Sequence, residues 1–275
     1  MHEDQPLSQE DRDRQLRALA TLDGYLNDLA EFQGRNRPTT ESLFALGTRE
    51  NGGIWWRETG DLPLAASFDH LEAFRTLLRG PIPRQAGFSV LRGSAEAAAV
   101  AWWVFDPDAT EEERVQRGFE ERLLGIHTQR GLVEQGKDRL AAQHDAVVDE
   151  AAKFGLSEEP NNRAKGLSHF GRPRLGTQDL LTRMMPDTPP ESKLSNGEIL
   201  WRVLSAFSHS ELWTNMLGLK ESEDDTRSRV LSVNMPTLMR MCALTVRAHD
   251  AAFSRRMLLA GHATWEAERG SLPRF

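Results

Sequence analysis

The sequence predicts an all-α protein, built as an antiparallel helical bundle with one long coiled-coil-like helix. Apolar residues recur at spacings of three and four through most of the 275 residues, which is the period of a helix with one buried face. Signals for β-strands are nearly absent, because the chain has one tyrosine and no alternating segment bounded by a hairpin turn. Hydrophobic residues make up 39% and charged residues 27%, the proportions of a globular protein. We expect one helical-bundle domain over residues 1–275, with loop-rich insertions at 35–63 and 155–195 and a loose tail at 270–275.

The first helix is expected over residues 8–32. Ser8 is suited to cap its N-terminus, and leucines spaced by three and four residues give it one apolar stripe. The stripe consists of Leu16, Leu19, Leu22, Leu26 and Leu29. The glycine-rich stretch 35–63 is expected to be a loop with a short helix, pinned to the bundle by Trp55 and Trp56.

Two helices are expected next, over residues 67–79 and 84–105. The second of these is apolar on nearly all sides, which predicts that it is the central helix of the bundle. Asp106 and Pro107 should end it.

The long helix is expected over residues 108–154. Asp108 or Thr110 can cap its start, and apolar residues then fall three, four or seven apart. Unbroken, it would measure about 65 Å. Gly131 and Gly136 mark the place where a break is expected if there is one.

The remaining chain predicts a locally basic loop followed by three helices. The loop covers about 155–175 and leads into a short helix over 177–185. A longer helix is expected over 195–219, and an acidic turn at 221–225 separates it from a last helix over 226–268. Pro236 either kinks that last helix or marks its true start.

Composition and missing motifs exclude several classes of function. The net charge of −7 excludes an all-over basic surface for nucleic acid, although not a local basic patch. The single cysteine, Cys242, allows no disulfide within the chain, and no apolar stretch approaches the roughly 20 residues that span a bilayer. We therefore expect a cytoplasmic protein that does not contact a membrane. No phosphate-binding loop, no G-x-S-x-G and no metal-binding His or Cys motif occurs, so we expect no metal and no cofactor.

One polar helix face carries residue types that can act on a phosphodiester. Arg202 and His209 are seven residues apart, so on a helix they project from one face about 10 Å apart along the axis. Ser205 lies between them on that face. A histidine can move a proton to or from the 2′-hydroxyl or the leaving oxygen of RNA, and an arginine can hold the phosphate, so this set can cleave RNA without a metal.

These residues resemble a known pattern. Arg202 and His209 are similar to the Arg-x4–6-His motif of the HEPN superfamily, helical-bundle proteins of which many are ribonucleases in toxin–antitoxin and phage-defence systems. The phrase LSAFSHS resembles the corresponding helix of HEPN-like bacterial proteins, and the segment 91–96 resembles the Arg-x3-Glu helix that those proteins carry upstream. The chain departs from the ribonuclease pattern at Val203, where a polar residue is usual.

The resemblance implies an RNA or nucleotide ligand and a symmetric homodimer whose two copies complete the site. It implies catalytic and substrate-binding roles for six residues. The catalytic residues would be Arg202, His209 and Ser205, and the substrate-binding residues would be Arg92, Glu96 and Ser210.

Other interpretations of the same residues stay open. His209 can belong to a polar network between helices with Arg202 in a salt bridge, and Arg92 with Glu96 can be a simple i, i+4 ion pair. The chain can then be a non-enzymatic scaffold or regulator whose helix 108–154 binds a protein partner or its own copy. A cyclase-like helical enzyme of small-molecule biosynthesis is the third interpretation. Exposure of Arg202 and His209 would favour the ribonuclease, and burial of both would contradict it.

Overall fold

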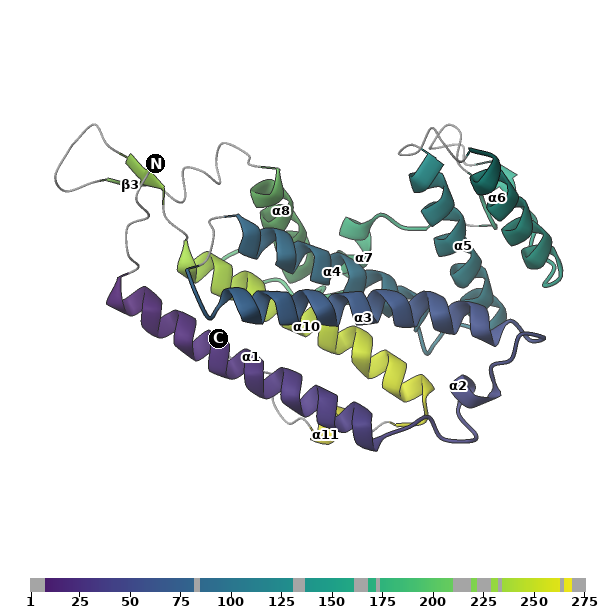
Figure 1. The fold of residues 1–275 in the computed structure, drawn as a ribbon, viewed down its shortest axis with the longest axis horizontal. Helices are drawn as coiled ribbons and strands as arrows, with labels where there is room; N and C mark the ends of the chain where they lie inside the picture. The colour runs from purple at the N-terminus through teal and green to yellow at the C-terminus, as the bar shows by residue number, and fades with distance from the viewer. Residues whose placement is uncertain are drawn as a thin grey trace.

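The computed structural model confirms the all-α bundle (Figure 1). It describes residues 8–81, 85–130, 137–160, 168–171, 174–209, 219–221, 229–231, 234–262 and 265–268. The helices of this part are α1 (Gln9–Arg35), α2 (Leu43–Leu46), α3 (Gly53–Leu77), α4 (Ala86–Val104), α5 (Glu111–Arg130), α6 (Lys137–Ala152), α7 (Thr177–Met184), α8 (Asn196–Ser208), α10 (Met235–Leu259) and α11 (Trp265–Glu268). None of the helices described combines the length and the apolar character needed to cross a membrane.

Helix α4 is the centre of the bundle, as its apolar sequence predicts. It packs against α3, α5, α7, α8 and α10. Small side chains let these helices approach closely, because Ala95, Ala98 and Ala99 are at most 1% exposed. The arrangement of the bundle therefore depends on α4, an alanine-rich helix that its neighbours cover from several directions.

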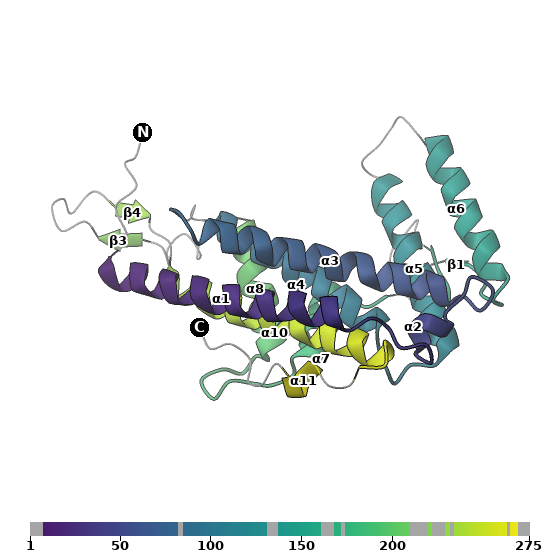
Figure 2. The same cartoon turned by 60° about the horizontal axis from the view of Figure 1, so that its bottom comes forward.

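Helix α1 lies along α3 and α10 on the outside of this core (Figure 2). The Ser8 side chain accepts a hydrogen bond from the backbone N–H of Asp11, which confirms the predicted cap. Of the predicted leucine stripe, Leu16 is 62% exposed and does not belong to the buried face. The buried face of α1 continues instead through Tyr25 and Phe32.

The helix expected over residues 67–79 begins much earlier, at Gly53, so the loop expected at 35–63 is shorter than predicted. Of the glycines in this stretch, Gly52 takes a left-handed conformation with φ of +76° just before α3, whereas Gly60 lies inside the helix and permits close packing. A Cβ at Gly60 would lie 2.4 Å from the ring of Phe105, a contact that a glycine avoids. Trp56 lies in the first turn of α3 and meets Phe44 of α2 edge-on, which ties the short helix to the bundle.

The segment expected as one helix over residues 108–154 forms two helices, α5 and α6, so the possible break is present and the unbroken form is wrong. They run antiparallel and side by side, at one end of the molecule (Figure 2). Residues 131–136, where Gly131 and Gly136 lie, fall outside the described part. The start is as predicted, because Thr110 accepts from the backbone N–H of Glu113 while the Glu113 carboxylate accepts from the N–H of Thr110.

In the described part of the chain, two short antiparallel strand pairs lie between the helices. In the loop expected at 155–195, β1 (Glu159–Pro160) pairs with β2 (Ser168–His169), and the helix expected at 177–185 is present as α7. One helix was expected to end at 219 and the next to begin at 226. The structure has instead β3 (Leu219–Glu221), which pairs with β4 (Arg229–Leu231).

The last long helix is shorter than expected at both ends. Pro236 lies in the first turn of α10 and so marks its true start. Gly261, with φ of +85°, follows the other end, and α11 is a separate short helix. The expected tail at 270–275 lies outside the described residues.

Two neighbouring glutamates of α5 hold the segment around β2 by different means. The buried Glu120 carboxylate accepts a hydrogen bond from the backbone N–H of Phe170, and its burial, partly offset by that bond, raises its pKa from 4.5 to about 7. The Glu121 carboxylate forms an ion pair of 2.7 Å with Nε of Arg174. The hydrogen bond from Phe170 needs only an acceptor oxygen at position 120, whereas the ion pair with Arg174 needs a negative charge at position 121.

Opposite effects are therefore expected for Glu120→Gln and Glu121→Gln. Above pH 7 the folded chain bears the cost of an ionised Glu120, whereas at pH 4 the carboxyl is protonated in both the folded and unfolded states. Since the Gln oxygen can still accept from Phe170, Glu120→Gln should raise the free energy of unfolding at pH 8 by about 1–2 kcal/mol, and the gain should vanish at pH 4. Burial raises the pKa of the Glu121 carboxyl as well, against the opposing effect of Arg174. Glu121→Gln should nevertheless lower the free energy of unfolding at pH 8 by about 2 kcal/mol, because it leaves the largely buried Arg174 guanidinium charged and without its partner. Urea denaturation at both pH values measures this, and a loss of stability in Glu120→Gln at pH 8 would contradict it.

Candidate functional site

Helix α8, which carries the predicted catalytic residues, is held on α4 by an aromatic stack. The rings of Phe88 and Phe207 are parallel, with centroids 3.7 Å apart and planes inclined by 4°. Leu200 and Leu204 are buried on the same side of α8. The Ser195 side chain accepts from the backbone N–H of Glu198 and caps the helix. These contacts fix the C-terminal end of α8 next to the N-terminal part of α4.

His209 lies at the C-terminal end of α8 and contacts Arg92 on α4. The backbone N–H of His209 donates to the carbonyl of Ser205, and the exposed side chain reaches over α4. Its Nε2 is 3.0 Å from Nη1 of Arg92. Arg92 in turn donates from Nε to the Glu96 carboxylate at 2.8 Å. A line of hydrogen bonds thus joins Glu96, Arg92 and His209 across two helices.

The Arg92 contact determines which nitrogen of His209 carries the proton. A guanidinium group can only donate hydrogen bonds, so Nε2 must be the acceptor and the neutral ring must carry its proton on Nδ1. The Arg92 and Glu96 side chains are 25% and 36% exposed. A ligand can therefore reach a guanidinium of fixed orientation and, next to it, an imidazole nitrogen whose lone pair is engaged by that guanidinium.

The other predicted residues are placed differently. The Arg202 side chain is 56% exposed and pairs with Glu198 one turn earlier, at 2.8 Å. Ser205 is half-buried, and Ser210 lies outside the described residues. The structure thus brings Arg92, Glu96 and His209 together, whereas Arg202 projects to solvent from the same helix as His209.

The predicted ion pair between Arg92 and Glu96 is confirmed, but its link to His209 was not predicted. The two helices are joined by residues 117 positions apart, and periodicity within one helix carries no information about such a contact. The sequence signal that could have found it was the resemblance itself, which singled out both segments separately.

No group of three or more His, Cys, Asp or Glu side chains suited to hold a metal ion occurs in the described part of the chain. Comparisons of the chain with protein families, with curated proteins and with solved structures found no match.

Proposed function

We propose that this chain is a HEPN-like, metal-independent ribonuclease in which His209 and Arg92 form the reactive centre. The observation that carries the proposal is the contact between Arg92 and His209, at an exposed position, with Glu96 holding the guanidinium from behind. Arg202 and Ser205, on the same helix as His209, provide further contacts for the RNA backbone.

The proposed reaction is attack of a ribose 2′-oxygen on the adjacent phosphorus. The Nε2 lone pair of His209 takes the 2′-hydroxyl proton while the bond from the 2′-oxygen to phosphorus forms. The bond from phosphorus to the 5′-oxygen breaks, and that oxygen leaves with a proton. The products are a 2′,3′-cyclic phosphate and a 5′-hydroxyl.

Arg92 must change partners for this reaction. An arriving phosphate is a stronger acceptor for the guanidinium than a neutral imidazole, so Arg92 turns its Nη atoms to the phosphate and releases His209 Nε2. Its positive charge then stabilises the charge that develops on the phosphate oxygens. Glu96 is a positioning residue, because it touches Arg92 and not the RNA. We propose that a second copy of the chain supplies the proton to the leaving oxygen, so that the active form is a homodimer.

Incubation of the purified protein with end-labelled single-stranded RNA in EDTA tests the proposal. His209→Ala should reduce the cleavage rate about 10²- to 10⁴-fold, since the proton carrier is lost. Arg92→Ala should reduce it about 10²- to 10³-fold. Arg240→Ala is the matched control, since Arg240 is a half-exposed arginine on α10 paired with Glu191, and it should cleave at the wild-type rate. No cleavage by the wild type, or equal cleavage by all four proteins, rejects the ribonuclease and leaves the scaffold and the cyclase-like interpretations.

Arg202→Ala separates the two arginines. As a contact to the RNA backbone, Arg202 should change KM more than kcat, whereas Arg92 should change kcat. If Arg202→Ala abolishes cleavage and Arg92→Ala cleaves at the wild-type rate, the reactive centre lies on the face of α8 alone and the assignment of Arg92 is wrong.

A further inference from the structure

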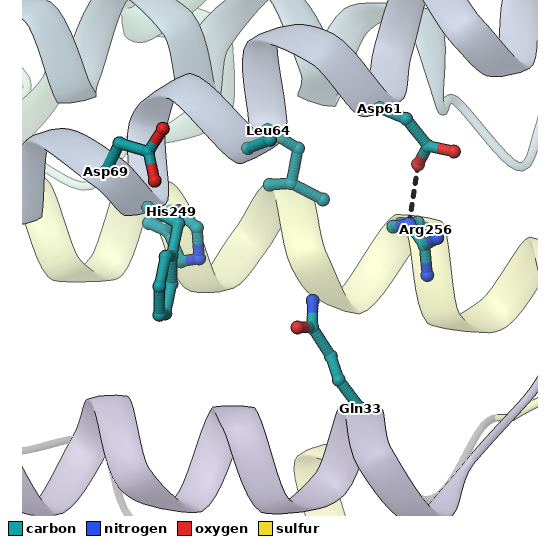
Figure 3. A pocket seen from close by; sticks show the side chains of 8 residues that line it. Gln33, Asp61, Leu64, Asp69, His249 and Arg256 are labelled. Carbon is teal, nitrogen blue, oxygen red and sulfur yellow. Dashed lines mark hydrogen bonds and ion pairs between the residues drawn. The ribbon is translucent and has the colours of Figure 1, made fainter.

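A second polar site lies on the other side of the core, between α1, α3 and α10. It is a cavity of about 360 Å³. Its lining consists of Gln33, Asp61, Leu64, Ala65, Phe68, Asp69, His249 and Arg256. Figure 3 shows Asp69 and His249 at one end, the pair of Asp61 and Arg256 at the other, and Gln33 facing them from α1. None of these residues belongs to the proposed ribonuclease site.

His249 is the unusual member of this lining, because it is 1% exposed and, among the described residues, only one of its ring nitrogens has a hydrogen-bond partner. Its Nδ1 is 2.9 Å from the Ser67 hydroxyl, and that hydroxyl is 2.9 Å from the Ser94 hydroxyl. Ser94 donates its own proton to the carbonyl of Ser67. Both serines are fully buried.

These contacts fix the protons in the chain of hydrogen bonds. Since the Ser94 proton is used on the carbonyl, the Ser67 hydroxyl donates to Ser94 and accepts from Nδ1–H of His249. Nε2 of His249 therefore carries a lone pair, on the side of the ring away from Ser67. Among the described residues no group hydrogen-bonds to this Nε2. Burial also lowers the pKa of His249 to about 4, so the ring is neutral at pH 7.

The cavity has a surplus of hydrogen-bond acceptors and of negative charge. Asp61 and Asp69 are carboxylates, and Arg256, the only cation among the described lining residues, is held by Asp61 through an Nε–Oδ1 contact of 2.7 Å. Among the described lining residues, Asp69 therefore faces no unpaired cation, and Nε2 of His249 has no hydrogen-bond donor. A ligand that complements the site must bring N–H donors and a positive charge. The apolar side chains of Leu64 and Phe68 suit a short hydrocarbon chain.

We propose that this cavity binds a small aliphatic ammonium compound, with its N–H groups donating to Nε2 of His249 and to the carboxylate of Asp69. A second amine at the other end of such a ligand would lie near Asp61. A short diamine has a hydrocarbon chain with a charged amine at each end, whereas an uncharged diol of the same length lacks the charge.

Calorimetric titration with 1,4-diaminobutane, and with 1,4-butanediol as the uncharged comparison, tests the site. The wild type should bind the diamine and not the diol. Asp69→Asn changes an exposed residue, so the variant should fold, and it should weaken diamine binding about tenfold or more. Asp145→Asn, which removes the charge of a 78% exposed aspartate on α6, is the matched control and should bind like the wild type.

Nitrogen NMR of the histidine side chains tests the role of His249 without a substitution. The diamine should shift the resonance of His249 Nε2, as expected when its lone pair accepts a new hydrogen bond. Absence of binding by the wild type, equal binding of the diol, unchanged affinity in Asp69→Asn, or an unshifted Nε2 signal at saturation would each overturn the proposal.

Discussion

Gly197→Ala is expected to lower the free energy of unfolding by about 3 kcal/mol, because no side chain fits where α8 crosses α7. A Cβ at Gly197 would lie 1.9 Å from the carbonyl oxygen of Leu181 and 2.3 Å from its carbonyl carbon. Both atoms belong to backbone, so a rotamer change cannot relieve the contact. The two helices would have to separate, and the hydrogen bond from the N–H of Gly197 to the carbonyl of Met185 would be lost with them.

Urea denaturation of Gly197→Ala and of Gly24→Ala measures this effect against a matched control. Gly24 is an exposed position inside α1, and a Cβ there would meet no atom within 4 Å. Gly24→Ala should therefore raise the free energy of unfolding by about 0.5–1 kcal/mol, through the higher helix propensity of alanine. Wild-type stability in Gly197→Ala would mean that α7 and α8 do not approach this closely. Since α8 carries His209, the same variant should also lose RNA cleavage if the proposed function is correct.

The contribution of His249 to stability is expected to fall as the pH drops from 6.5 to 4, because this histidine is neutral in the fold. An unfolded chain binds a proton at this histidine near pH 6.5, whereas burial keeps the folded ring neutral until about pH 4. Stability from this group is therefore complete above pH 6.5 and is lost as the pH falls. The difference corresponds to about 3 kcal/mol.

The difference between wild type and His249→Gln isolates this contribution. The variant should be less stable than the wild type at pH 7.5, because Gln fits the aromatic surroundings of Tyr25, Phe68 and Phe253 less well. Its disadvantage should shrink as the pH is lowered to 4, since Gln does not titrate and all other groups are common to both proteins. A constant difference from pH 7.5 to 4 would show that His249 does not change its proton affinity on folding.

Local signals predicted the starts of α1, α5 and α8, whereas non-local packing decided much of the rest. The side chains of Ser8, Thr110 and Ser195 each accept a hydrogen bond from a backbone N–H three residues later. Each of these contacts is made within four consecutive residues. Gly60 was interpreted as part of a loop, and the reason for a glycine at this position is the ring of Phe105, 45 positions away. A turn and a close contact between helices can both require a glycine, so the position of a glycine in the sequence does not distinguish the two.

The contacts of the candidate sites also divide into local ones, which the sequence predicts, and non-local ones, which it does not. The ion pair of Arg92 with Glu96 is one helical turn long and follows from spacing alone. The contact of Arg92 with His209 joins α4 to α8, and it depends on how two apolar faces meet. His249 stands between Arg247 and Asp250 with no motif around it, and its contact with Ser67, 182 positions earlier in the chain, appears only in the fold.

The central position of α4 has a consequence for synthesis of the protein. This helix ends at Val104, yet part of its apolar surface is covered by α10, which begins at Met235. At typical translation rates the two helices leave the ribosome roughly 10 s apart. During that interval the nascent chain exposes an alanine- and tryptophan-rich surface, so expression of this protein should depend on chaperones that shield incomplete chains.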